Sequence, residues 1–195
     1  MNYGLLIAMW VLFYTSHSIM AATKIKKKMR RIMGRSYKWY RLTYSFFSVL
    51  FFLWILMYAA TIPVSVVLEP SQFLAYLGFV LAGFGTIIAV KAFKGQSLKR
   101  FLGIIPHDDL TTVEPLHTEG LYGWMRHPMY AGLLLIFLGF FFYLPYISSL
   151  IHLLALLVYL PFGIYFEEKK LIALYGDDYR TYQAKVPVLF PTRKP

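Results

Sequence analysis

The sequence contains no cysteine and few acidic residues. The absence of cysteine from its 195 residues excludes disulfides and catalysis by a thiol side chain, and it leaves the compartment open. Only 9 Asp and Glu stand against 20 Lys and Arg, which gives a net charge of +11. Because the basic residues flank long apolar runs, we expect them to set membrane orientation and to meet anionic membrane lipid, and we expect no nucleic acid partner.

Apolar residues are abundant, at 58% of the chain. About 20 apolar residues cross a bilayer as a helix, and backbone polar groups in lipid must be satisfied within their own segment. Five segments reach or approach that length: 3–22, 44–62, 73–93, 129–144 and 147–166. No basic stretch precedes the first segment and no cleavage site follows it, so we expect a retained span rather than a signal peptide. The sequence therefore predicts an all-α integral membrane protein with five transmembrane helices.

The loop charges predict the orientation of these helices. Residues 24–41 carry nine Lys and Arg, whereas the connection 63–72 carries one charged residue, Glu69, and the link near Pro145 carries none. The remaining basic residues lie in 94–128 and in the tail, apart from Lys91 near the end of the third segment. By the positive-inside rule, the N-terminus is outside and the C-terminus is cytoplasmic.

We expect a single membrane domain over residues 1–195. Residues 1–93 form three N-terminal spans, and residues 94–195 form a cytoplasmic loop, a helical hairpin and a tail. The segment 94–128 is long for a loop, and long ordered loops are usually functional. The acidic and basic residues 167–170 continue the last helix beyond the membrane, and Gly176 is a suitable stop. The ordered loop and tail together are expected to form the site.

The richest candidate segment is 119–132, at the cytoplasmic end of the fourth span. Pro128 can occupy the first turn of that helix. Arg126 and His127 then lie just before it, where free backbone N–H groups favour an anion. The alternative is interfacial anchoring, since Arg, Tyr and Trp are common at the membrane surface.

A second candidate is the acidic pair Glu167 and Glu168, where the fifth span leaves the membrane. Two adjacent acids at that depth are costly without a cation or water. The alternative is a solvated helix end balanced by Lys169 and Lys170. Because spans four and five form a hairpin, we expect 126–130 to lie close to Glu167, which makes one site of mixed charge.

The histidines His107, His117 and His127 are ten residues apart, which matches no usual metal spacing, and we expect no metal. Gly83-Phe84-Gly85 in the third span either lets a ligand approach the backbone or lets helices pack closely, and packing is favoured.

Two segments resemble the isoprenylcysteine carboxyl methyltransferases and their relatives. Residues 126–132 resemble the R-H-P-x-Y-x-G signature of that family. Residues 167–187 resemble its E-E-x-x-L-x-x-x-[FY]-G-x-x-Y-x-x-Y-x-x-x-V-P ending. The two motifs occur in this order around a helical hairpin, and the compact five-span chain is most similar to prokaryotic members.

The resemblance implies S-adenosylmethionine as the methyl donor, bound on the cytoplasmic side, with S-adenosylhomocysteine as the product. It implies an acceptor that carries a lipid modification, either a small molecule or a protein C-terminus, methylated at a carboxylate. Arg126 is the residue expected to orient the carboxylate of substrate or cofactor. The residues that the resemblance implies as cofactor contacts are Glu114, Pro115, Leu116, His117, Tyr122, His127, Pro128, Met129, Tyr130 and Glu167.

One position departs from the family pattern. Members that act on prenylcysteine carry an arginine one helical turn before the first glutamate, and Gly163 stands at that position here. Either Arg126 takes that role or the substrate differs. A carboxylate acceptor is ionised near neutral pH and needs no general base, only alignment with the methyl group in a dry pocket.

Three other functions remain open. A phospholipid N-methyltransferase would use the same cofactor but would need a deprotonated amine, with His127 or Glu168 as base. A sterol-type reductase would need NADPH, for which the sequence has no dedicated motif. A small transporter or assembly factor would bind no cofactor and leaves two long ordered cytoplasmic segments without a role.

Overall fold

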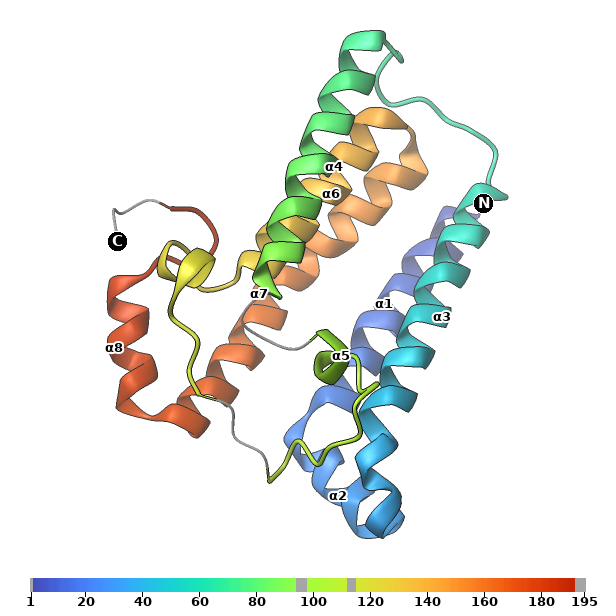
Figure 1. Ribbon diagram of the computed structural model, residues 1–195. Helices are drawn as coiled ribbons and strands as arrows, with labels where there is room; N and C mark the ends of the chain where they lie inside the picture. The colour runs from blue at the N-terminus through green and yellow to red at the C-terminus, as the bar shows by residue number, and fades with distance from the viewer. Residues whose placement is uncertain (1, 94–97, 112–114, 192–195) are drawn as a thin grey trace. The chain divides into compact units, whose positions relative to one another are not determined.

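The computed structural model describes residues 2–93, 98–111 and 115–191 (Figure 1). Within these ranges the regular structure is helical, apart from a single antiparallel bridge between Val66 and Tyr146. The prediction of an all-α chain is confirmed. By its internal contacts the chain divides into two compact units, Met1–Pro63 with Gln96–Pro115, and Val64–Gly95 with Leu116–Pro195.

The first unit is built on two apolar helices, α1 (Tyr3–Ala21) and α3 (Tyr40–Ala60), which lie side by side in Figure 1. In the sequence these two helices are connected by α2 (Thr23–Met33) and the 3-10 helix η1 (Gly34–Trp39). The unit also contains the short α5 (Leu98–Phe101). The core of this unit is narrow. Leu6, Trp10 and Ile55 are almost fully buried, and the Trp10 ring lies 6.0 Å from that of Phe52.

Segment 23–39, expected as a charged loop, is helical in the structure. Lys and Arg are good helix formers, so a basic loop of this length can continue as helix where a partner holds it. That partner is Asp109, which pairs with the buried Lys26. The Tyr37 hydroxyl donates to Asp109 at 2.8 Å, and Arg41 Nη1 lies 3.8 Å from the same carboxylate. The ion pairs fasten residues 108–109 to the basic helix.

The second unit contains α4 (Gln72–Ala92), η2 (Gly120–Gly123), α6 (Pro128–Tyr143), α7 (Ile147–Tyr175) and α8 (Asp177–Lys185). Helices α4 and α6 approach closely through glycines. A Cβ on Gly85 would lie 2.6 Å from the Gly132 carbonyl oxygen, and one on Gly78 would lie 2.6 Å from that of Gly139. The expectation that glycine in 83–85 serves helix packing is therefore confirmed at Gly85.

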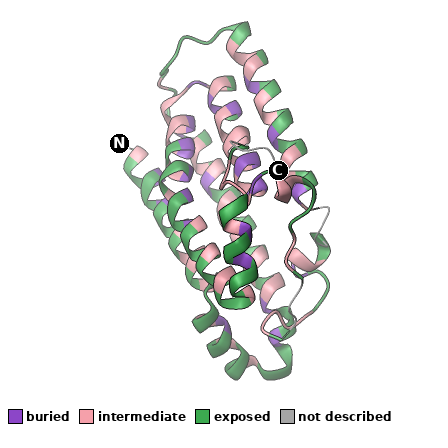
Figure 2. Cartoon of the chain, turned by 90° about the vertical axis from the view of Figure 1, so that its left-hand side faces the viewer, coloured by how far each residue is buried: buried purple, intermediate pink, exposed green. Residues whose placement is uncertain are grey.

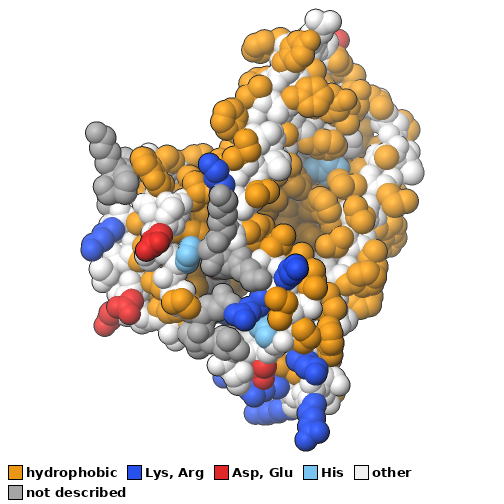
Figure 3. Space-filling view, viewed as in Figure 1, with side chains coloured by type: hydrophobic (Ala, Val, Ile, Leu, Met, Phe, Trp, Pro, Cys, Tyr) orange, Lys and Arg blue, Asp and Glu red, His pale blue; other side chains and the backbone are white. Residues whose placement is uncertain are grey.

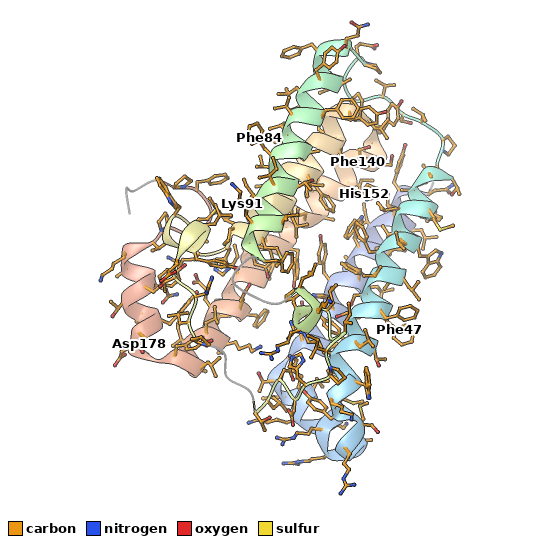
Figure 4. All side chains as sticks on the ribbon, in the orientation of Figure 1. Phe47, Phe84, Lys91, Phe140, His152 and Asp178 are labelled. Carbon is orange, nitrogen blue, oxygen red and sulfur yellow. The ribbon has the colours of Figure 1, made fainter. Side chains whose placement is uncertain are left out.

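Helices α6 and α7 form the expected hairpin. Phe140 of α6 and His152 of α7 face each other with ring centroids 6.0 Å apart (Figure 4). Helix α7 runs for 29 residues and ends at Gly176, whose φ of 59° lies in the left-handed region that glycine adopts readily. The tail then reverses into α8.

Among the described residues, four helical segments are long and apolar enough to cross a membrane: Tyr3–Ala21, Thr23–Ala60, Gln72–Ala92 and Ile147–Tyr175. The fourth predicted span corresponds to α6, which is shorter at 16 residues. Large apolar side chains such as Trp54 and Val158 are more than 60% exposed. Figures 2 and 3 show these long helices with exposed, largely hydrophobic outer surfaces. Apolar surface of this extent suits a lipid environment.

Candidate functional site

The candidate site lies in the second unit, where the start of α6, the end of α7 and the tail meet. Pro128 is the first residue of α6, as predicted, and His127 precedes it as the N-cap. A proline is tolerated there because its missing N–H would have no partner within the helix. Glu167 and Glu168 lie eight and seven residues before the end of α7 at Tyr175. Hairpin geometry thus brings His127 to both glutamates.

Glu168 is the hub of this cluster. Its carboxylate accepts hydrogen bonds from Arg126 Nε at 2.7 Å, His127 Nε2 at 3.1 Å and Gln183 Nε2 at 2.9 Å. The side chains of Arg126 and Glu168 are only 9% and 17% exposed. An ion pair at this depth requires further hydrogen bonds to offset its desolvation, and the histidine and glutamine supply them.

Arg126 also holds the tail. Its Nη1 donates to the carbonyl oxygens of Val186 at 2.5 Å and Gln183 at 3.1 Å. The backbone N–H groups of Arg126 and His127 donate to Pro187 and Val188 at 2.9 and 3.1 Å. The tail is thereby docked along the segment that leads into α6. The expected role of Arg126 in orienting a ligand remains a prediction, since its Nε and Nη1 donors serve Glu168 and the tail.

Glu167 has different surroundings. Its Oε2 lies 3.5 Å from His127 Nδ1, and its side chain is 45% exposed. His127 is nearly fully buried, stands between the two carboxylates and stacks on Tyr130 at 5.6 Å. Burial acts to lower the pKa of His127, but the hydrogen bonds and charges of Glu167 and Glu168 outweigh it and raise that pKa. The protonated form of His127 is therefore stabilised relative to that of a free imidazole, and Glu167 keeps an accessible carboxylate.

The other predicted cofactor residues are distributed unevenly. The rings of His117 and Tyr122 lie 5.5 Å apart, and burial followed by the charge of Glu167 raises the pKa of Tyr122. Tyr122 and His117 therefore belong to the same region as Glu167. Leu116 also belongs to this unit, whereas Pro115 belongs to the first unit. Glu114 lies outside the described residues.

Pro128 is almost fully buried at the start of α6, and Met129 is half-buried beside it. Both residues share the helix start with His127, so the signature residues lie together. Their contact with a cofactor stays a prediction.

At Gly163 the ring of Tyr159 lies where the side chain of a larger residue would begin. A Cβ on Gly163 would lie 3.0 Å from Cε1 of Tyr159 and 3.5 Å from the hydroxyl of Tyr130. Tyr159 is one turn earlier on α7, so it covers this face of the helix in place of a side chain at 163. The surroundings of Gly163, next to Tyr130, are thus aromatic.

Sequence reasoning gave no site role to Gln183, Tyr182 or Tyr179. The Tyr182 hydroxyl donates to the Tyr122 carbonyl oxygen at 2.6 Å and fastens α8 to the segment before α6. The hydroxyl of Tyr179 is buried and has no hydrogen-bond partner among the described residues. The tail motif contained both tyrosines, but sequence spacing does not tell which hydroxyl has a partner.

The residues present fit a zwitterionic ligand such as S-adenosylmethionine. Glu167 offers an accessible carboxylate to a cation, and Tyr179 offers a buried hydroxyl that no described residue uses. Among the residues that the structure describes, no group of three or more His, Cys, Asp or Glu could hold a metal ion.

Comparison with known proteins places the chain among membrane methyltransferase relatives. A family model described as NnrU protein matches residues 5–190. A methanethiol S-methyltransferase of Crocosphaera subtropica is 26% identical over 92% of this chain and 71% of the relative. Methanethiol S-methyltransferase 1 of Bradyrhizobium diazoefficiens is 28% identical over 94% of this chain and 65% of the relative, which is just under two thirds of its length.

A third relative covers a shorter part. The protein-S-isoprenylcysteine O-methyltransferase of Schizosaccharomyces pombe is 31% identical over 116 residues, which are 59% of this chain and 48% of the relative. This match agrees with the family resemblance of the two sequence motifs. No solved structure matches the chain.

Proposed function

The chain belongs to the NnrU protein family, and from that premise we propose that it is an integral membrane methyltransferase that takes its methyl group from S-adenosylmethionine. The observation that carries the proposal is the arrangement around His127. A buried cluster of Arg126, His127 and Glu168 holds the tail against the start of α6 and leaves the Glu167 carboxylate accessible. Such an anionic group beside aromatic rings suits a cationic cofactor.

The residues of the chain have separable tasks in this reaction. Glu167 binds the cationic part of the cofactor, while His127 and Tyr130 line its pocket. Glu168 and Arg126 keep the tail closed over the site, which excludes water and so strengthens attraction between the reacting charges. When bound, the cofactor supplies an electrophilic methyl group on a sulfonium.

Two acceptors are candidates. A thiol is favoured by the two methanethiol S-methyltransferases, which align with more than 90% of this chain, and by Gly163, which offers no arginine to hold a carboxylate. The thiol of cysteine has a pKa of about 8.5, and any thiol acceptor must release its proton to solvent or a base before its sulfur attacks the methyl group. The second candidate is the carboxylate of a prenylcysteine-like acceptor, which the isoprenylcysteine relative and the two motifs favour. It would enter from lipid and would need no base.

The proposal includes a topology of five crossings, with the N-terminus outside and the site facing the cytoplasm. The basic residues of α2 and the mixed charges of the tail support it through the positive-inside rule. Helix α6 rises about 24 Å at 1.5 Å per residue. That is shorter than the hydrocarbon core of about 30 Å, so this crossing requires local thinning of the bilayer or cover from neighbouring helices.

Calorimetry of the purified protein with S-adenosylhomocysteine tests the cofactor. We expect saturable binding, and Glu167→Ala should abolish it. If the wild-type protein gives no heat of binding at millimolar ligand, the methyltransferase proposal is wrong. Affinity of Glu167→Ala within a few-fold of wild type would place the site elsewhere.

The acceptor is tested by methyl transfer from labelled S-adenosylmethionine to a short alkyl thiol, to N-acetyl-S-farnesylcysteine and to phosphatidylethanolamine. We expect the thiol to be the best acceptor, with a rate that rises with pH as the thiol ionises. Transfer to farnesylcysteine at a rate independent of pH near neutrality would support the carboxylate instead. Transfer to phosphatidylethanolamine alone would favour the phospholipid N-methyltransferase.

A further inference from the structure

Two tyrosines on α8, Tyr179 and Tyr182, lie almost one turn apart and differ in the hydrogen bonding of their hydroxyl groups. Tyr179 is 1% exposed and Tyr182 is 7% exposed, and their ring centroids are 5.8 Å apart. The Tyr182 hydroxyl donates to the Tyr122 carbonyl oxygen at 2.6 Å. The Tyr179 hydroxyl is buried, but it has no hydrogen-bond partner among the residues that the structure describes.

A buried hydroxyl without a partner costs free energy, because it has given up its hydrogen bonds to water. A phenylalanine would fill nearly the same space without that cost. A tyrosine in this position is therefore better explained by a group that the hydroxyl binds during function than by packing of the ring.

The charges around Tyr179 indicate which group that is. Burial raises the pKa of Tyr179, as does the charge of Glu168, so the phenol remains neutral and can donate its proton. Tyr179 lies one turn before Gln183 on the same face of α8, and the Gln183 amide donates to Glu168 at 2.9 Å, so this face of α8 meets the charged cluster. Glu167 and Glu168 attract cations, so a zwitterionic ligand near Tyr179 presents its amino-acid end to this cluster. The phenol of Tyr179 can then donate a hydrogen bond to a carboxylate oxygen of that end.

We infer that the Tyr179 hydroxyl donates a hydrogen bond to the amino-acid carboxylate of the bound cofactor, while Glu167 takes its ammonium group. The inference rests on the proposed function, because it assumes that S-adenosylmethionine binds in this region. It adds a cofactor-binding residue in the tail, so that docking of the tail and binding of the cofactor are coupled.

Tyr179→Phe and Tyr182→Phe form a matched pair for the test. We expect Tyr179→Phe, without ligand, to melt at the wild-type temperature or above, because an unsatisfied hydroxyl has been removed. Its affinity for S-adenosylhomocysteine, measured by calorimetry, should fall at least tenfold. Tyr182→Phe, without ligand, should melt below wild type, because it loses the hydrogen bond to Tyr122. Tyr182→Phe is the control, because it shows that the melting experiment detects the loss of one hydrogen bond made by a buried hydroxyl.

Binding of 5′-methylthioadenosine, which lacks the amino-acid moiety, identifies the group that is bound. Wild type and Tyr179→Phe should bind it equally. An equal loss for both ligands would assign the hydroxyl to the nucleoside and overturn the inference, as would unchanged affinity for S-adenosylhomocysteine. A melting temperature of Tyr179→Phe as low as that of Tyr182→Phe would show a partner within the protein and also overturn it. If the wild-type protein binds neither ligand, the proposed function itself fails.

Discussion

The adjacent acids Glu167 and Glu168 have the same chemistry but different surroundings. Glu168 accepts three side-chain hydrogen bonds and is largely buried, while Glu167 contacts His127 at 3.5 Å and is 45% exposed. Neighbouring residues of a helix face different directions, so helical spacing favours different surroundings for the two acids. It cannot tell which acid is buried, because the answer depends on where Gln183 and the tail come to lie.

The first prediction separates the two acids. Glu168→Gln should lower the free energy of unfolding by about 2 kcal/mol, because hydrogen bonds to a charged group are lost and Arg126 keeps a buried charge. Glu167→Gln should lower the melting temperature less than Glu168→Gln does, because its contact with His127 is half-exposed, and should weaken binding of S-adenosylhomocysteine more than tenfold. Thermal unfolding in detergent and calorimetry measure the two effects. Equal loss of stability in both variants would contradict the assignment of a mainly structural role to Glu168 and a ligand-binding role to Glu167.

The second prediction concerns pH. The pKa of His127 is raised in the folded protein, chiefly by Glu167 and Glu168 against the opposing effect of burial. Its contribution to stability is therefore complete below the unfolded value of about 6.5 and is lost as pH rises through the higher folded-state pKa. The melting temperature should fall across that range in wild type and in His117→Gln. His127→Gln should remove this part of the fall, and a curve parallel to wild type would refute the assignment.

Helices α4 and α6 show how far a local pattern predicts packing. Gly83-Phe84-Gly85 pointed to close packing, and Gly85 fulfils it, whereas a Cβ on Gly83 would meet no atom within 4 Å. Gly78, Gly132 and Gly139 complete the interface. The glycines within each helix are seven residues apart, a spacing readable in the sequence. Among the five predicted spans only the third and the fourth contain two glycines at this spacing, so it could also have indicated that these two spans pack together.

The third prediction uses this contrast between glycines. Gly132→Ala would place its Cβ 2.7 Å from the Gly85 carbonyl oxygen and 2.9 Å from the Ala89 nitrogen. Backbone atoms cannot move aside cheaply, so the variant should lose about 1–3 kcal/mol of stability. Gly83→Ala, with open space at its Cβ, is the matched control and should be neutral or slightly stabilising. Thermal unfolding of both variants decides, and equal melting temperatures would contradict the close approach.

The fourth prediction concerns the loop that fastens α2. Asp109 pairs with the buried Lys26, and Tyr37 also donates to it, whereas Asp108 pairs with Arg30, whose side chain is 46% exposed. Asp109→Asn should destabilise the first unit by about 3 kcal/mol, because a buried lysine loses its counter-charge. Asp108→Asn should cost less than about 1 kcal/mol, since exposed pairs contribute little. Thermal unfolding compares them, and a greater loss in Asp108→Asn would refute this interpretation.

For the chain as a whole, hydropathy predicted the helices well and the connections poorly. The five apolar segments correspond to α1, α3, α4, α6 and α7, with ends that differ by a few residues, except that α7 continues nine residues beyond its apolar segment, towards the predicted stop at Gly176. The helical structure of α2 was missed because its partner, Asp109, lies more than 80 residues away in the sequence. The sequence correctly predicted that distant residues lie close together only where a hairpin makes them neighbours, as with His127 and Glu167.

The last prediction tests the number of crossings, which helix length alone leaves between four and five because α6 has 16 residues. The chain has no cysteine, so single cysteines can be introduced without background. The exposed positions Lys28, Glu69, Tyr143 and Asp178 sample successive connections and the tail, where Asp178 projects from α8 (Figure 4). With five crossings, an impermeant maleimide should label Glu69→Cys and Tyr143→Cys on intact cells. Lys28→Cys and Asp178→Cys should react only after permeabilisation.

If α6 fails to cross while α7 does, the parity of the chain changes and Asp178→Cys becomes labelled from outside. If neither crosses, Tyr143→Cys is protected, so the two positions together distinguish all three topologies and determine whether the site can meet a cytoplasmic cofactor.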